Sequence, residues 1–207
     1  MNHERLGSPI LAVPRIFSIL KLRMLNWFST LAYKTSTASF GSNSYVMHGA
    51  NLREPSRVHI GNSCQIWSNV YVFSELPNGT LFIGDGVQIN HAAILDNSAT
   101  MKIGEKTLIS DNAKLYTHDH GFDPRSKPIA YEKTIGSNVW IGMSATIMPK
   151  CKHIGNNAIV GAGAIVTKDV PAGAIVAGNP AKIVAWVNGF SDIHLQNSKP
   201  TKFNKET

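Results

Sequence analysis

Aliphatic residues recur every six positions along most of this chain, and they fall in groups of three. Within 134–148, for example, Ile135, Ile141 and Ile147 are each six residues apart. Amphipathic helices repeat every 3.6 residues and strands alternate with a period of two, so neither accounts for this spacing. Five such triplets follow one another: Ile60, Ile66, Val72; Ile83, Ile89, Leu95; Ile103, Ile109, Leu115; Ile135, Ile141, Ile147; Ile154, Val160, Val166. A weaker first set, Phe40, Val46 and Leu52, begins with an aromatic residue.

A second column of small or medium side chains keeps register with the first. It lies four residues after a marked aliphatic, at Cys64, Val70, Val87, Ala93, Thr107, Ala113, Val139, Ala145, Ala158 and Ala164. Two such columns predict an all-β fold, a three-sided parallel β-helix of about six coils with three short strands in each coil. The marked aliphatics would point inward, each contributing about 1.5–3 kcal/mol by burial. Cys64 and Cys151 both belong to the second column and are predicted core residues.

Departures from the six-residue spacing all come after the third member of a triplet. The insertions should therefore leave the prism at one shared edge. The largest, 116–134, is predicted to protrude as a loop, since Asp119, Asp123, Pro124 and Pro128 are typical of turns. Loops on a rigid scaffold commonly carry functional residues.

The N-terminal 39 residues lie outside the repeat and are predicted to form a helical cap segment. The stretch 10–28 is apolar but contains Arg15, Lys21 and Arg23, too many charges for a bilayer-spanning helix. One interpretation is a helix packed on its own domain. The other is peripheral membrane contact, with the basic residues at lipid headgroups. We find no secretory leader pattern here.

The β-helix domain is predicted over 40–178, followed by a C-terminal segment at 179–207. Within that segment Ala181–Val187 is predicted to form a short helix that caps the last coil. The polar residues 190–207 are predicted to form a loose tail.

Composition adds little to the pattern. Hydrophobic residues make up 43% and charged residues 16% of the chain, which favours a folded domain over disorder. The net charge of +7 suits an anionic ligand, nucleic acid or an acidic surface, but does not choose among them. The two cysteines form neither a disulfide framework nor a metal motif, so a reducing compartment is the default.

Three segments make the chain recognisable: "VWIGMSATIMP", "IGNNAIVGAGAIVTKDVP" and "AGNPAKIV". They resemble the hexapeptide-repeat acyltransferases, whose fold is a left-handed parallel β-helix. Within this family the chain is most similar to sugar O-acetyltransferases, such as the galactoside and maltose enzymes and those acting on bacterial surface polysaccharides. The resemblance implies a homotrimer, acetyl-CoA as acetyl donor, and active sites between two subunits.

The resemblance also implies roles for individual residues. His120, five residues after Leu115, matches the catalytic histidine, and His118 would support it. Asn90 matches an asparagine that contacts the sugar. The positions expected to bind the coenzyme are Trp140, Met143, Ala162, Thr167, Lys168 and Lys182. Alternatively, Lys168 and Lys182 are solvated surface lysines, and Asn90 only occupies a β-helix corner, where asparagine is common.

The expected reaction is acetyl transfer from acetyl-CoA to a sugar hydroxyl, in surface polysaccharide biosynthesis in the cytoplasm or at the inner membrane face. His120 would remove the hydroxyl proton as general base. We expect direct attack, because an acyl-enzyme would need an activated nucleophile and neither cysteine is placed for that.

Three alternatives remain open from the sequence. The enzyme could N-acetylate an amino sugar, or the chain could be a non-catalytic trimeric scaffold. A zinc enzyme of the carbonic anhydrase type would need three convergent histidines, with His91 as the third. The segments "GAGAIVTKD" and "GNPAK" favour acyl transfer over this zinc chemistry, so no metal is expected. Nucleic acid is not expected as a partner either.

Overall fold

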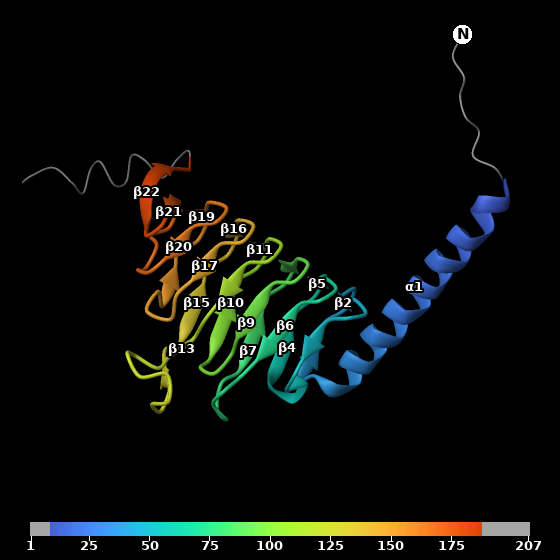
Figure 1. The fold of residues 1–207 in the computed structure, drawn as a ribbon, viewed down its shortest axis with the longest axis horizontal. Helices are drawn as coiled ribbons and strands as arrows, with labels where there is room; N and C mark the ends of the chain where they lie inside the picture. The colour runs from blue at the N-terminus through green and yellow to red at the C-terminus, as the bar shows by residue number, and fades with distance from the viewer. Residues whose placement is uncertain (1–8, 188–207) are drawn as a thin grey trace, which may run out of the picture.

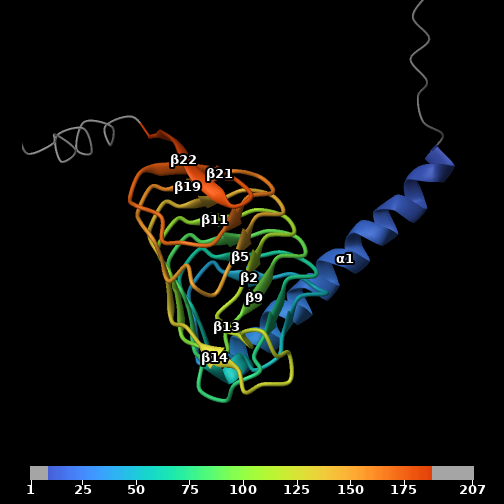
Figure 2. The ribbon, with the colours of Figure 1, turned by 60° about the vertical axis from the view of Figure 1, so that its left-hand side comes forward.

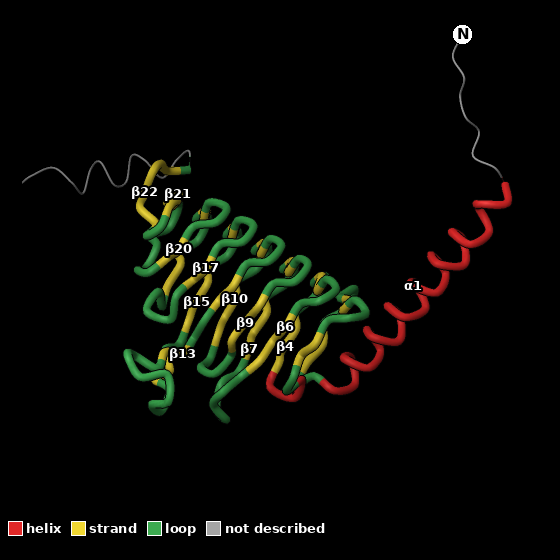
Figure 3. Tube along the Cα trace, in the orientation of Figure 1, coloured by secondary structure: helices red, strands yellow, loops and turns green. Residues whose placement is uncertain are grey.

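A computed structural model of the chain describes residues 9–187. It forms a parallel β-helix with one long helix projecting from its N-terminal end (Figure 1). The strands are short and are separated by turns, and they line three flat faces (Figure 3). There are six complete coils, and β21 with a bridge between Ile154 and Val170 begins a seventh.

Each complete coil contributes one strand to each face. The first face consists of β1 (Ser39–Phe40), β4 (Val58–Ile60), β7 (Leu81–Ile83), β10 (Met101–Ile103), β15 (Lys133–Ile135) and β18 (His153–Ile154). The second consists of β2 (Tyr45–Val46), β5 (Gln65–Ile66), β8 (Gln88–Ile89), β11 (Leu108–Ile109), β16 (Trp140–Ile141), β19 (Ile159–Val160), β21 (Ala174–Gly178) and β22 (Ala181–Trp186). The third consists of β3 (Asn51–Leu52), β6 (Tyr71–Phe73), β9 (Ile94–Asp96), β12 (Lys114–Leu115), β17 (Thr146–Ile147) and β20 (Ile165–Val166).

The core is the stack of marked aliphatics that the sequence predicts. Ile103 pairs in register with Ile83 on one side and with Ile135 on the other, so equivalent side chains lie directly above one another. All marked positions are buried except the partly buried Phe40, and the whole second column is buried with them. The predicted β-helix is therefore confirmed, and its geometry is consistent with the left-handed form of this fold.

The first two corners of each coil are tight turns. The residue three positions after the marked aliphatic has a positive φ there, as at Asn43, Asn69 and Asn138. Asparagine and glycine tolerate this left-handed conformation best, which explains their frequency in the turns. The third corner has no such constraint and accommodates the insertions, among them the 3-10 turn η1 (Pro55–Arg57).

The largest insertion protrudes as predicted, at one corner of the stacked coils (Figure 2). It is more ordered than a plain loop, because β13 (His118–Asp119) pairs antiparallel with β14 (Ile129–Ala130). This ladder holds the histidine-bearing segment against its own return strand.

The predicted C-terminal helix is wrong. Ala181–Trp186 is the strand β22, which pairs antiparallel with β21. The last coil would otherwise expose unpaired backbone groups at its edge, and a strand satisfies them where a helix would not. The predicted loose tail at 190–207 lies outside the described residues.

The predicted N-terminal helix is confirmed as α1 (Pro9–Ser36), but only its C-terminal part packs on the β-helix. Thr30 hydrogen-bonds the backbone of Val46, and the Tyr33 hydroxyl donates to the carbonyl of Ala50. Further towards its start the helix exposes apolar side chains, including Phe17 and Leu20. Within residues 9–187 no helix combines the length and apolar character that a bilayer crossing requires.

Candidate active site

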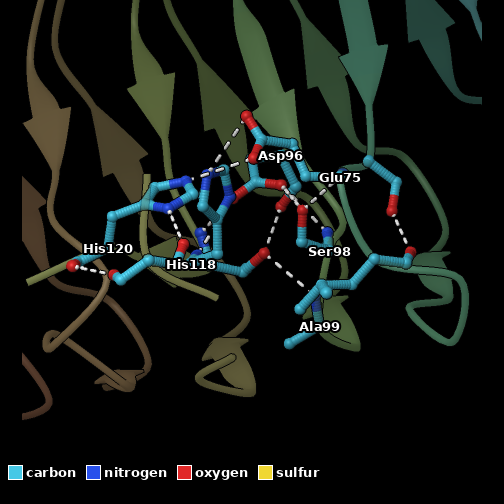
Figure 4. Close-up of polar contacts among 10 residues, drawn as sticks. Glu75, Asp96, Ser98, Ala99, His118 and His120 are labelled. Atoms are coloured by element: carbon cyan, nitrogen blue, oxygen red, sulfur yellow. Dashed lines mark hydrogen bonds and ion pairs between the residues drawn. The ribbon is translucent and has the colours of Figure 1, made fainter. Parts of the chain in front are cut away.

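Two histidines from the protruding insertion lie next to each other at the edge between the third and first faces (Figure 4). The ring centroids of His118 and His120 are 5.3 Å apart, and the planes are nearly perpendicular. Nδ1 of His120 lies 2.8 Å from the carbonyl oxygen of Ser126, whose hydroxyl donates back to the carbonyl of His120 at 2.6 Å. The Ser126 carbonyl therefore fixes the orientation of the His120 ring, and the Ser126 hydroxyl ties the backbone of His120 to the same residue.

Asp96, which ends β9 in the preceding coil, holds the imidazole of His118. Its Oδ2 lies 2.7 Å from His118 Nδ1 and also accepts hydrogen bonds from the backbone N–H groups of Thr117 and His118. Its Oδ1 accepts from the N–H and hydroxyl of Ser98. Full burial alone would raise the pKa of Asp96, but the hydrogen bonds from Ser98 and Thr117 outweigh it and hold the pKa below its ordinary value. Asp96 is therefore an ionised carboxylate.

Glu75 reaches the same cluster from the insertion that follows β6, one coil further back. Its Oε2 lies 3.2 Å from Nε2 of His120 and its Oε1 lies 3.5 Å from Nε2 of His118. The hydrogen bond to the Ser126 carbonyl raises the pKa of His120, and the carboxylate of Glu75 raises it further. Glu75 is also tied to the Asp96 network, because its backbone N–H donates to the hydroxyl of Ser98.

The hydrogen bonds fix which ring nitrogen carries the proton. A carbonyl and an ionised carboxylate can only accept, so Nδ1 is the protonated nitrogen in both His118 and His120. In the neutral rings Nε2 then carries the lone pair, and in both residues Nε2 faces Glu75. Such a nitrogen can accept a proton or bind a metal ion. In the described part of the chain the ligand atoms of Glu75, His118 and His120 all lie within 4.8 Å of one another.

Four of the other predicted site residues gather elsewhere. Trp140, Met143, Ala162 and Asn90 line a mainly apolar groove of about 440 Å³ at the edge between the second and third faces. The indole N–H of Trp140 donates to the Ser110 hydroxyl at 3.0 Å, while half of the residue remains exposed. The apolar lining, with Asn90, Ser110 and Asp111 among it, suits a partly apolar ligand.

The remaining predicted coenzyme contacts lie at the C-terminal end of the solenoid. Lys168 and Lys182 line a separate cavity of about 420 Å³ beside β22. Thr167 is exposed directly after β20. The structure thus brings the predicted residues together in three groups, and it does not bring Asn90 to the histidines.

The sequence interpretation missed Glu75 and Asp96, and it expected His91 as a third histidine if the site held zinc. His91 instead hydrogen-bonds Ser68, with its Nδ1 2.8 Å from the Ser68 hydroxyl. A signal for the missed residues does exist. Glu75, Asp96 and the histidine pair each follow the third marked aliphatic of successive coils, and stacking brings those positions to one edge.

Comparisons with known proteins agree with this architecture. The family model for the bacterial transferase hexapeptide (six repeats) matches residues 132–168. The galactoside O-acetyltransferase of Escherichia coli K12 is 33% identical over 149 residues, which cover 67% of this chain and 71% of that protein. The chain belongs to the hexapeptide-repeat transferase family.

Two further similarities bear on function. The putative lipopolysaccharide biosynthesis O-acetyl transferase WbbJ of E. coli K12 is 31% identical over 123 residues. The alignment covers 53% of this chain and 62% of WbbJ, which is less than two thirds of that protein. A crystal structure of a point mutant of AntD, an N-acyltransferase from Bacillus cereus, in complex with dTDP-4-amino-4,6-dideoxyglucose and coenzyme A has a TM-score of 0.68. It is 18% identical, and the alignment covers 79% of this chain and 91% of AntD. The likeness to AntD is one of fold.

Proposed function

We propose that this protein is an acetyl-CoA-dependent O-acetyltransferase that acts on a sugar hydroxyl, in the biosynthesis of a bacterial surface polysaccharide such as a capsule, O-antigen or exopolysaccharide. The observation that carries the proposal is the pair of imidazoles whose Nδ1 atoms are bound to fixed acceptors. This arrangement leaves Nε2 of each ring available to take a proton. Membership of the hexapeptide-repeat transferases supplies the reaction class.

His120 acts as the general base in this proposal. Its Nε2 removes the proton of the acceptor hydroxyl while the oxygen attacks the thioester carbonyl; the carbon–sulfur bond then breaks, and the proton passes to the departing thiolate. The side chain of His120 is 27% exposed and that of His118 only 9%, so His120 is the better placed to reach a hydroxyl. His118, anchored by Asp96, supports the position of its neighbour.

Direct transfer is favoured over an acyl-enzyme. Cys64 and Cys151 are both fully buried, and burial raises the pKa of each thiol, that of Cys151 to about 11. A buried, protonated thiol is a poor nucleophile.

Acetyl-CoA would lie along the groove of Trp140, Met143 and Ala162, and Thr167, Lys168 and Lys182 would meet its phosphates. AntD, which shares the fold, is in complex with coenzyme A, and this supports the donor. The groove and the histidines lie on different edges of one chain, so the proposal includes a homotrimer in which the groove of one subunit faces the histidines of the next. Asn90, on the groove side, would contact the sugar.

The chemical identity of the acceptor is inferred from the relatives. The galactoside enzyme and WbbJ are O-acetyltransferases, which favours a hydroxyl. N-acylation of an amino sugar is the second candidate, because AntD is an N-acyltransferase with an amino-sugar nucleotide bound. The coenzyme would place the reaction in the cytoplasm.

The exposed stretch of α1 from Arg15 to Arg23 would hold the enzyme at the inner membrane face. Apolar side chains such as Phe17 and Leu20 alternate there with Arg15, Lys21 and Arg23, all exposed. Basic residues beside exposed apolar ones favour anionic lipid surfaces. Sedimentation with anionic but not with neutral vesicles would support this location, and equal recovery from both would argue against it.

The test of the proposed function is release of free coenzyme A thiol from acetyl-CoA across a panel of hydroxyl and amino sugars, free and nucleotide-linked. His120→Ala should lower the rate at least about 100-fold. His153→Ala, which removes an exposed histidine on the first face, is the matched control and should retain the rate. Absence of thiol release with every acceptor, or full activity of His120→Ala, would contradict the proposal.

A further inference from the structure

We propose that Glu75, His118 and His120 together bind one zinc ion, and that zinc bound there blocks acyl transfer. The binding site stands on the geometry alone. The inhibition rests on the proposed function, because it requires His120 to be the base.

The distances between ligand atoms fit a tetrahedral ion. Zinc bonds to histidine nitrogen and carboxylate oxygen are about 2.0–2.2 Å long, which places neighbouring ligand atoms about 3.3 Å apart. Nε2 of His118 lies 3.5 Å from Oε1 of Glu75, and Nε2 of His120 lies 3.2 Å from Oε2 of the same carboxylate. One ligand atom from each of the three residues lies within 4.8 Å of the other two, so a modest adjustment of the side chains would complete the site.

The surroundings of the rings are those of metal-binding histidines. A ligating imidazole usually donates its other N–H to a carboxylate or a backbone carbonyl, which fixes the tautomer and the ring orientation. His118 makes this bond to Asp96 and His120 makes it to the Ser126 carbonyl. Both second partners are themselves held, Asp96 by four further hydrogen bonds and Ser126 by its own bond to His120.

Electrostatics also favours a cation at this point. Nδ1 of each ring is held by an acceptor, and Nε2 of each ring faces the carboxylate of Glu75, which can only accept. The negative charge of buried Asp96 lies directly behind His118. A metal ion between the three ligand atoms would take the place of the proton that otherwise joins Nε2 of His120 to Glu75.

Two nitrogens and one carboxylate select the class of ion. Mg²⁺ and Ca²⁺ prefer sets made of oxygen atoms, whereas zinc binds imidazole and carboxylate readily. Three protein ligands leave a fourth position open to water. Zinc on Nε2 of His120 uses the lone pair that would otherwise accept the proton of the acceptor, so the bound enzyme cannot act as a base.

The experiment titrates the full-length protein with Zn²⁺ in competition with a chromophoric chelator. The wild type should bind one zinc per chain, and Glu75→Gln and His120→Gln should each weaken binding at least about tenfold. His153→Gln should bind like the wild type, since His153 lies on the first face. Co²⁺ in place of zinc should give the intense visible spectrum of a tetrahedral site, and His120→Gln should lose this spectrum. Thermal melts show whether each variant is folded.

Outcomes for binding and for activity are separable. Substoichiometric zinc in the wild type, or wild-type affinity in both site variants, overturns the site. If the enzyme releases thiol, saturating zinc should abolish release and a chelator should restore it, and Glu75→Gln should need at least about tenfold more zinc for half-inhibition. Thiol release that zinc leaves unchanged or stimulates overturns the inhibition. Zinc binding without any thiol release would leave the site standing while the proposed function fails.

Discussion

His118 and Asp96 are 22 residues apart in sequence, yet His118 Nδ1 lies 2.7 Å from the carboxylate of Asp96. The contact depends on the stacking of two coils, since β9 and β12 pair in parallel and bring the residues that follow them to the same edge. The same carboxylate oxygen accepts the N–H groups of Thr117 and His118, so it fixes the first residues of the protruding insertion as well as the ring.

Asp96→Asn is expected to lower both stability and activity. The amide is uncharged, and its NH₂ group must face at least one of the N–H or O–H groups that now donate to Asp96, so at least one hydrogen bond is lost. Since hydrogen bonds to a charged group contribute about 1.5–3 kcal/mol each, we expect a loss of about 2–3 kcal/mol in the free energy of unfolding. Thiol release should fall at least tenfold because the histidine loop loses its anchor. Urea denaturation and the thiol assay measure the two effects.

Asp123→Asn is the control for this change. The side chain of Asp123 accepts the N–H of Arg125, and among the described residues no contact of this side chain with either histidine is found. Its substitution should cost less than about 0.5 kcal/mol. Equal stability of Asp96→Asn and the wild type would contradict the role assigned to the buried carboxylate.

The buried ammonium group of Lys133 should make stability depend on pH. Its Nζ donates to the carbonyls of Met148 and Cys151, and burial lowers the pKa of Lys133 from its ordinary 10.5 to about 8. Above pH 8 the folded protein releases this proton while the unfolded chain still binds it, so stability rises with pH. Above pH 9 the Cys151 thiol, whose pKa is raised to about 11, ionises first in the unfolded chain and opposes the rise.

Lys133→Met isolates this effect. Between pH 8 and 9 the wild type should gain about 1 kcal/mol relative to Lys133→Met, because one pH unit corresponds to about 1.4 kcal/mol for a full proton. Urea denaturation at pH 7, 8 and 9 measures the difference. Lys102→Met, on the exposed side of β10, should show no such trend. A constant difference between the wild type and Lys133→Met across this range would refute the linkage.

Close contact between coils should make one glycine indispensable and another replaceable. A Cβ on Gly104 would lie 2.6 Å from the backbone of Gly136 and Ser137 in the next coil, so Gly104→Ala should destabilise the protein by about 3 kcal/mol. Gly163 has a φ of +68° but open space around it, so Gly163→Ala should cost only about 1 kcal/mol. Thermal melts of the two variants should rank them in this order, and the reverse order would contradict the packing.

Trp140→Ala should weaken the use of acetyl-CoA if the apolar groove holds the coenzyme. The indole is half exposed on the groove wall and is held by Ser110, so its loss removes contact area with little effect on the core. We expect KM for acetyl-CoA to rise about tenfold, which corresponds to about 1.4 kcal/mol of binding. Phe82→Ala, an exposed aromatic on the first face, should leave KM unchanged. An unchanged KM in Trp140→Ala would place the coenzyme elsewhere.

The sequence by itself determined the solenoid. Each marked aliphatic points inward because the coil returns to the same face after a fixed number of residues, and this regularity is local enough to read along the chain. The breaks in spacing also located the protruding insertion. His120 was singled out because it follows Leu115 by five residues, the position of the catalytic histidine in the enzymes that the chain resembles.

Tertiary structure alone decided what meets at the insertion edge and how the solenoid ends. Glu75, Asp96 and His118 lie outside the six-residue pattern of inward-facing residues, and their contacts exist only because three coils stack in register. Ala181–Trp186 became a strand because the last coil offered it an edge to pair with, a demand that local propensity does not express. Periodicity records which side chains face the core, whereas contacts between separate insertions depend on how whole coils are placed upon one another.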